Sequence, residues 1–562
     1  MKTRKSNFFR LGLIAGSLLS FSLAANAQAK KAAPLKLPDP QNTVRAIVQS
    51  GKLDDLRWPN FTDYRIHLEN FYRPASYALA WIHDGQPTTR AQELIAIFSQ
   101  ASNEGLNPED YDSLRWTKRL AELTGDPTSQ ARFDVALTVC TMRYISDVRI
   151  GRINPSHFKF GIDIKNKKLD LPKFVRQLLA DDTDIKKEFA DIEPNFPGYR
   201  ATRAALLHYM ELAKQDAGSA KLPAPSGIVF PSGPYDGVPR IAQLLKLVGD
   251  LPQDAIVRDE KIYEEPLVKA VEHFQSRHGL RPDGYLTRST IEAMNVPLTT
   301  RVEQLRLTLE RYRWLQYDPN ESEVVVNLPG YRLYAFEPGG KLGFAMNVNV
   351  GDAYDFQTPI FENKIRYLVF RPYWNVPPRI LRNEVVADIS DDRNYIKDAD
   401  MEVTTPDGKV VTSGVISDAV LQQLRAGKLS VRQRPGPENA LGLVKIIFPN
   451  EHSVYLHDTP ESVDMFSEEE RALSHGCIHL QHPAELAAWL LRDKPGWNLE
   501  RTEDAMQHGP NNITVNLTRP VPILIIYATA VIRKDGGVNF YKDIYGHDAS
   551  LESALAEGYP YP

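Results

Sequence analysis

The tetrapeptide Ser474-His475-Gly476-Cys477 contains the residue types of a thiol nucleophile. The chain has two cysteines in 562 residues, and one of them stands here beside histidine and glycine. A lone cysteine that has histidine nearby is a candidate nucleophile rather than half of a structural disulfide. A thiol has an ordinary pKa of about 8.5 and attacks as thiolate, so it needs a base. His457, with 16 residues between it and Ser474, is the predicted base.

The same segment is compatible with a second chemistry. His475, Cys477 and His479 alternate, so on an extended strand they would share one face, and His457 could add a fourth zinc ligand. Alternate ligands on one strand strain tetrahedral closure, and no acidic general base stands among them. The residues favour the thiol nucleophile, and a zinc peptidase is the alternative.

Residues 1–27 have the pattern of a secretory signal peptide. A basic start is followed by an uncharged apolar run from Leu11 to Leu23, and Ala25-Asn26-Ala27 places small residues at the cleavage position. We expect cleavage before Gln28 and export of the mature chain. The apolar run is short for a membrane span of about 20 residues. An uncleaved membrane anchor is the alternative.

The composition narrows the class of protein. The net charge of −4 gives no overall attraction for nucleic acid or anionic lipid. Hydrophobic residues make up 42% and charged residues 25%, as in ordinary globular proteins.

The second cysteine, Cys140, lies in a predicted helix, and we expect it to be a small buried hydrophobic residue. A disulfide between Cys140 and Cys477 would abolish the thiol chemistry.

Composition shifts divide the first half of the chain. Residues 28–42 are expected to form a flexible leader and residues 43–213 a mostly helical scaffold. Thr88 or Thr89 is placed to cap one of its helices, and further helices are predicted at 129–148 and 199–213.

A small unit follows the scaffold region. Residues 214–234 are rich in proline, glycine and serine and are typical of a linker. Three short amphipathic helices are predicted within 235–297. Thr287 is expected to cap the third of them, after a turn at Pro282-Asp283-Gly284.

The second half of the chain has a strand pattern. Hairpins are predicted within 324–336 and 443–456, and the second delivers His457 at a strand end. The main β domain is expected over 322–500. Within it, the polar, partly helical stretch 377–433 is expected to form a capping flap. Residues 501–562 are expected to complete the scaffold or the sheet.

These motifs resemble those of known families. His457, the 16-residue gap and Ser474-His475-Gly476-Cys477 resemble the signature of the YkuD-type L,D-transpeptidase catalytic domain. Phe274-Gln275, with Gly279-Leu280 and the Pro-Asp-Gly turn, resembles the type 1 peptidoglycan-binding module. The stretch Tyr373 to Pro377 and the domain order look like the large periplasmic YcbB-like branch.

The resemblance implies a multidomain fold. It comprises a mostly α scaffold, a three-helix peptidoglycan-binding module and a mainly β, sandwich-like α+β catalytic domain with a partly helical flap. It implies a periplasmic location, peptidoglycan stem peptides as partners, and no metal or cofactor. A non-catalytic wall-binding protein with the same fold is a further alternative.

The resemblance also assigns roles to residues. Cys477 would attack the L,D peptide bond of a tetrapeptide stem and release D-alanine, and a diaminopimelate amine would then take the acyl group in a 3→3 cross-link. His457 would be the base, with a neighbouring backbone carbonyl orienting its ring. The N–H groups of Gly476 and Cys477 would stabilise an oxyanion, worth about 3 kcal/mol per donor. Ser474 and His475 would shape the loop.

One position departs from the family pattern. The family usually has arginine two residues after the cysteine, whereas this chain has His479. Arginine is a permanent bidentate carboxylate binder and histidine is not, so stem recognition would change or Arg434 would compensate. Tyr373 and Trp374 are expected near the cleft. His479, Arg434, Tyr373 and Trp374 are therefore the predicted substrate contacts.

Overall fold

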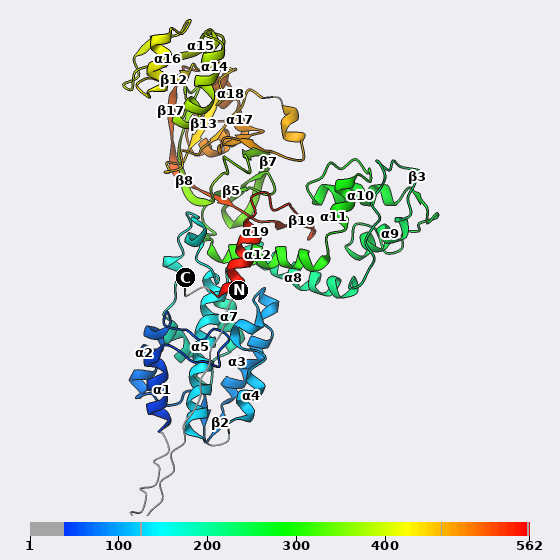
Figure 1. Cartoon of the computed structure of the whole chain (residues 1–562), viewed down its shortest axis with the longest axis vertical. Helices are drawn as coiled ribbons and strands as arrows, with labels where there is room; N and C mark the ends of the chain where they lie inside the picture. Colours follow the sequence, from blue (N-terminus) through cyan, green and yellow to red (C-terminus); the bar gives the residue numbers. More distant parts are fainter. Residues whose placement is uncertain (1–38, 124–125, 462, 559–560, 562) are drawn as a thin grey trace, which may run out of the picture.

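The computed structural model describes residues 39–123, 126–461, 463–558 and 561. The predicted signal peptide and most of the predicted leader lie outside these residues. A helical scaffold, a small helical module to one side and a mainly β domain with a cap form an elongated molecule (Figure 1). This multidomain architecture confirms the predicted fold class. None of the described helices is long and apolar enough to cross a bilayer.

The scaffold begins earlier than predicted. The first helix starts at Pro40 because Asp39 caps it, its side chain accepting a hydrogen bond from the Gln41 N–H. The last residues assigned to the flexible leader, 40–42, are therefore helical. The scaffold elements are α1 (Pro40–Ser50), α2 (Arg65–Tyr72), β1 (Ile82–His83), β2 (Gln86–Pro87), α3 (Thr89–Ser99), α4 (Trp116–Ala121), α5 (Pro127–Ile150), α6 (Leu171–Leu178), α7 (Ile185–Ile192) and α8 (Pro197–Gln215).

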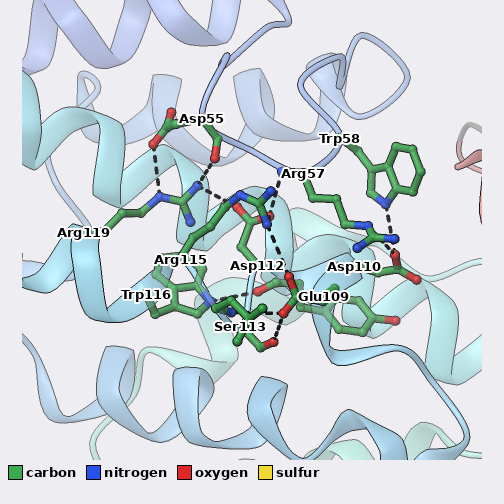
Figure 2. Close-up of polar contacts among 12 residues, drawn as sticks. Asp55, Arg57, Trp58, Glu109, Asp110, Asp112, Ser113, Arg115, Trp116 and Arg119 are labelled. Carbon is green, nitrogen blue, oxygen red and sulfur yellow. Dashed lines mark hydrogen bonds and ion pairs between the residues drawn. The ribbon is translucent and has the colours of Figure 1, made fainter.

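Buried ion pairs fix a turn of the scaffold against its core (Figure 2). The Arg119 guanidinium bonds the Asp112 carboxylate at 2.6 Å and Asp55 at 3.1 Å. Asp112 also accepts the Arg57 backbone N–H at 2.8 Å. Because breaking such a pair leaves an uncompensated buried charge, these contacts make the loop around Arg57 costly to move. Cys140 is buried in α5, and both cysteines are free thiols.

The module forms a separate three-helix unit with its own core. Its elements are β3 (Gly233–Pro234), α9 (Val238–Leu247), β4 (Ile262–Tyr263), α10 (Leu267–Arg277) and α11 (Arg288–Met294). The buried Gln275 amide accepts the Gly284 N–H at 2.8 Å and donates to the Tyr285 carbonyl at 3.0 Å. Thr287 caps α11 as predicted. Gln275 of the Phe-Gln motif thus holds the turn at Pro282-Asp283-Gly284 in place.

The β domain contains a nine-stranded sheet that closes on itself. The strand order is β15-β7-β16-β14-β13-β8-β17-β5-β6, and β6 also pairs with β7. Both predicted hairpins are present as antiparallel pairs, β5 with β6 and β13 with β14. The elements are β5 (Glu323–Asn327), β6 (Arg332–Glu337), β7 (Lys341–Gly351), β8 (Phe361–Phe370), β13 (Val444–Ile447), β14 (Leu456–His457), β15 (Ala472–Ser474), β16 (Ile478–Leu480), α17 (Pro483–Leu491), α18 (Leu499–Gln507) and β17 (Ile513–Ile526).

The two faces of this sheet differ in chemistry. Along β7, Met346, Val348 and Val350 point into the core, so the intervening Asn347 and Asn349 lie on the outer face. The same alternation places Leu456 inside and His457 outside. The outer face therefore carries polar residues, among them the candidate site residue His457.

The stretch 377–433 and its flanking residues, 373–376 and 434, form a unit called the cap, which has its own core and its own sheet, ordered β11-β10-β12-β9. The cap lies at the end of the molecule distant from the scaffold (Figure 1). Its elements are β9 (Trp374–Asn375), α13 (Pro378–Ile380), a π-helical turn (Leu381–Val385), α14 (Val386–Asp391), α15 (Tyr395–Asp398), β10 (Met401–Thr404), β11 (Val410–Thr412), α16 (Asp418–Arg425) and β12 (Ser430–Gln433).

The units are joined by a helix for which the sequence pattern predicts no element, α12 (Leu298–Trp314). The Arg311 guanidinium of α12 binds Asp548 at 2.5 Å, and its Glu310 carboxylate accepts the Ile153 N–H at 2.9 Å. Asp548 belongs to the C-terminal elements, which are β18 (Ala530–Ile532), β19 (Val538–Phe540) and α19 (His547–Glu557). The segment after residue 500 thus contributes β17 to the sheet and α19 to the contacts of α12.

Candidate active site

Two short parallel strands bring the candidate residues together. β14 pairs with β16, and His457 lies opposite His479 in their register. The loop from Ser474 to Cys477 connects β15 to β16, and both of these strands pair with the end of β7. Residues about 20 positions apart in the sequence therefore share one end of the sheet.

His457 is held as a neutral imidazole. Its imidazole is 3% exposed, and Nδ1 donates to the Asp458 carbonyl oxygen at 2.5 Å. This is the predicted orienting carbonyl, and it leaves Nε2 to accept a proton. Burial lowers the pKa of His457 well below its usual value, and the neighbouring His479 lowers it further. The Asp458 carboxylate instead accepts the Leu443 N–H at 2.7 Å.

Cys477 is held as a protonated thiol. Burial raises its pKa to about 11, while hydrogen bonds from Tyr455 and the charge of Lys445 oppose that rise. Its sulfur lies 3.9 Å from the Ser453 carbonyl oxygen. Among the described residues, no hydrogen bond joins this sulfur to His457. The resting pair is therefore a thiol and a neutral imidazole, and the proton has to move when the sulfur attacks.

Ser474 holds the catalytic loop closed. Its hydroxyl donates to the Cys477 carbonyl at 2.5 Å and accepts the Gly476 N–H at 3.1 Å. Behind the loop, the Thr358 hydroxyl donates to the Gly476 carbonyl at 2.9 Å. Gly476 has φ of +104°, a conformation that side-chain-bearing residues rarely adopt. Glycine is therefore required where the loop turns.

The hydrogen bond to Ser474 corrects one prediction. The Gly476 N–H was expected to face an oxyanion, but in this conformation it is already donated within the loop. The Cys477 N–H has no recorded acceptor within the described part of the chain, and it remains available. An oxyanion formed at this site would therefore rely on the Cys477 N–H rather than on both groups.

His475 connects the catalytic loop to the cap. Its Nε2 lies 3.1 Å from a Glu384 carboxylate oxygen, in the π-helical turn of the cap. The ring also meets Phe356 edge to face at 4.6 Å between centroids. His475 thus has a contact role between the loop and the cap.

His479 lies beside His457. Its ring centroid is 4.6 Å from that of His457, and its Nδ1 lies 3.6 Å from Glu461. The Asn349 amide also approaches Nδ1, at 3.5 Å. The hydrogen bond from His479 lowers the pKa of the Glu461 carboxyl. The position that usually carries arginine therefore faces both the base and a carboxylate.

The other three predicted substrate contacts belong to the cap. Arg434 binds Asp400 at 2.8 Å and Glu402 at 3.0 Å. Tyr373 lies under the guanidinium of Arg432, at 4.4 Å from the ring centroid. Trp374 pairs with β12 in the cap sheet and packs on the cap core. No contact recorded among the described residues joins any of the three to Cys477, His457 or His479.

Two neighbours of the thiol were missed from the sequence. Lys445 lies opposite His457 in the β13–β14 register, and its ammonium group is 5.7 Å from the centroid of the Tyr455 ring. The Tyr455 ring lies 5.7 Å from His457. Both alternate with core residues on the predicted hairpin, so the outward pattern of that hairpin was the available signal.

The geometry does not favour the zinc alternative. His475 faces Glu384, whereas His479 faces Glu461 and His457, so the alternating residues do not converge on one point. No group of three or more His, Cys, Asp or Glu side chains in the described ranges is arranged to hold a metal ion.

A closed sheet in which a loop cysteine precedes β16, and a buried neutral histidine ends the neighbouring strand β14, defines a candidate cysteine acyl-transfer site. Family models agree with this class. The L,D-transpeptidase catalytic domain matches residues 321–521, the "Putative peptidoglycan binding domain" matches 235–294, and the scaffold domain matches 67–206. The chain therefore contains a YkuD L,D-transpeptidase catalytic domain, a peptidoglycan-binding domain and a scaffold domain.

Individual proteins give a partial match. A "Putative L,D-transpeptidase" of Haemophilus influenzae is 28% identical over 278 residues, which cover 49% of this chain and 55% of that protein. The chain thus spans about half the length of this relative. The L,D-transpeptidase structure (residues 123–326) from Xylanimonas cellulosilytica shares 12% identity, with 54% of this chain and 100% of that chain covered and a TM-score of 0.16.

The resting protonation state can be tested by alkylation. Iodoacetamide reacts with thiolate, so the rate at Cys477 should rise with pH toward the thiol pKa of about 11. Cys140→Ala, measured alongside, removes any contribution from the buried second thiol. A rate that is already level between about pH 5 and 8 would indicate a thiolate–imidazolium pair and contradict the neutral pair.

Proposed function

We propose that this protein is a peptidoglycan L,D-transpeptidase that forms 3→3 cross-links in cell-wall remodelling. The observation that carries the proposal is that Cys477 directly precedes β16 and His457 ends the parallel neighbour β14, with its Nδ1 tied to the Asp458 carbonyl. The matches to the catalytic and peptidoglycan-binding domains support it.

The proposed reaction has two steps. The Cys477 sulfur attacks the carbonyl carbon of the L,D bond in a tetrapeptide stem while His457 takes the thiol proton. The C–N bond breaks, D-alanine leaves with the proton from His457, and a thioester remains. A diaminopimelate amine of a second stem then attacks the thioester, loses a proton to His457 and restores the thiol as the 3→3 amide forms.

The surroundings of the thiol support this assignment. Water attack on the thioester would yield only hydrolysis, and we propose that the cap limits the access of water to the site. The His475–Glu384 contact, at 3.1 Å, is the point at which cap and catalytic loop meet. We propose that His479, beside Glu461, takes part in stem recognition in the place of the usual arginine. Arg434, Tyr373 and Trp374 would act from the cap.

The proposed function also implies a location for the protein, and two alternative functions can be weighed against it. A substrate in the cell wall requires export, which agrees with the signal-peptide pattern of residues 1–27, and we propose a periplasmic protein. The free thiol and oriented imidazole argue against a non-catalytic wall-binding protein. The divergent directions of His475 and His479 argue against a zinc peptidase.

Muropeptide analysis tests the reaction. We expect the purified protein to convert tetrapeptide-bearing wall fragments into 3→3 dimers and free D-alanine. Cys477→Ala should reduce the yield by at least about 1,000-fold, because the nucleophile is gone. Cys140→Ala is the matched control and should retain the wild-type yield. Dimers formed equally by Cys477→Ala would refute the assignment.

The departure at His479 gives a second test. His479→Arg restores the usual residue beside Glu461, and we expect turnover to be retained or to increase, because arginine binds carboxylates permanently and in bidentate fashion. The rate of D-alanine release measures it, and His482→Arg, a half-exposed histidine nearby, controls for added charge. Total loss of activity in His479→Arg would rule out the idea that another residue, such as Arg434, compensates for the missing arginine.

A further inference from the structure

A cavity of about 760 Å³ lies apart from the thiol, where scaffold, module and β domain meet. Its walls come from the start of α8, the end of α10, the residues after α12 and the C-terminal β18–β19 segment, and its floor is the outer face of β5, β6 and β7. These elements come together in the middle of the molecule (Figure 1). The volume is within the range of small-molecule ligand sites.

Aromatic rings line opposite sides of this cavity. On its floor, Tyr334 and Phe336 are nearly parallel, with centroids 6.1 Å apart and an interplanar angle of 20°. On the scaffold side, Phe196 and Tyr317 lie 5.8 Å apart. These rings offer flat surfaces on which the apolar faces of pyranose sugars can stack. The lining also carries charged donors that can bind hydroxyl and carbonyl oxygens, namely Arg332, Arg471, Arg533 and Lys534.

Glu323 adds a carboxyl group to this floor. It lies at the start of β5, and no hydrogen bond or ion pair of its carboxylate is recorded among the described residues. Burial raises the pKa of this carboxyl to about 7. The carboxyl is thus free to bind a ligand in the cavity, and sugar hydroxyl and acetamido N–H groups are suitable donors.

A single strand links the cavity to the active site. The Arg332 guanidinium on the floor donates to the Asn347 amide oxygen at 2.8 Å. Two residues further along β7, Asn349 approaches His479 at 3.5 Å. Ala345, which lines the cavity, and Asn349 are thus about 13 Å apart along one strand face. A polymer lying in the cavity would therefore lie along the same strand face as Asn349, the strand neighbour of His479.

We propose that this cavity binds the glycan strand of the wall polymer, a chain of N-acetylated amino sugars, and so presents its stem peptide to Cys477. The inference rests on the proposed function for the choice of polymer. It assigns sugar binding to the junction of the three units, in addition to any binding by the module itself.

Direct binding to peptide-free sugar tests this site. The full-length protein is titrated with chitotetraose and with glycan strands stripped of stem peptides, by calorimetry. We expect Tyr334→Ala to weaken binding at least five-fold, through loss of the stacking surface. Glu323→Gln, which keeps the shape of the side chain, should weaken binding at least two-fold. Tyr354→Ala removes a tyrosine that is 92% exposed on the same domain and should bind as wild type.

The outcomes separate the cavity from its alternatives. No binding of either sugar probe overturns the proposal. So does equal binding by wild type, Tyr334→Ala and Glu323→Gln, which would locate sugar binding in the module or elsewhere. Loss of binding with Tyr334→Ala alone, with a lowered melting temperature, would reflect a fold defect and also overturn it. None of these binding measurements requires the enzyme to turn over substrate. Failure of the transpeptidase assignment would therefore be seen separately, in the muropeptide analysis.

Discussion

The pairing of β7 with three other strands is the constraint on which the rest of the structure depends. Its first part pairs with β6, and its end pairs with β16 and β15. This closes the sheet and fixes both ends of the loop that carries Cys477. A Cβ on Gly351, the last residue of β7, would lie 2.9 Å from the Gly476 Cα, so the loop can approach only because that strand ends in glycine.

Burial at this strand end sets the protonation states of the pair. The same enclosure that lowers the pKa of His457 raises that of Cys477, so neither group carries charge at rest. A neutral pair avoids the cost of holding an ion pair in a poorly solvated site. With a neutral pair, the thiol proton of Cys477 moves only when the sulfur attacks a carbonyl. Lys445 is placed to stabilise the sulfur as negative charge develops.

Local patterns predicted much of this arrangement, because periodicity and capping are local. Thr88 caps α3, and the hairpin ending at His457 forms where strand alternation predicts it. The helix α12 could not be predicted in the same way. Its Glu310 and Arg311 suggest an exposed segment, and they are buried only because distant partners such as Asp548 satisfy them. The Gly476 N–H was misassigned for a similar reason, since its acceptor is set by the folded loop. Contacts of the cap with His475 likewise depend on tertiary structure.

The central claim is that Cys477 forms a thioester with the stem peptide and that His457 is its base. Trapping this intermediate tests it most directly: the protein is mixed with a tetrapeptide stem without acceptor, quenched in acid and analysed by intact mass and peptide mapping. The account predicts the added mass of the acyl group on the peptide that contains Cys477, removed by hydroxylamine, absent in Cys477→Ala and strongly reduced in His457→Ala. Release of D-alanine with Cys477 unmodified, and undiminished in Cys477→Ala, would contradict it.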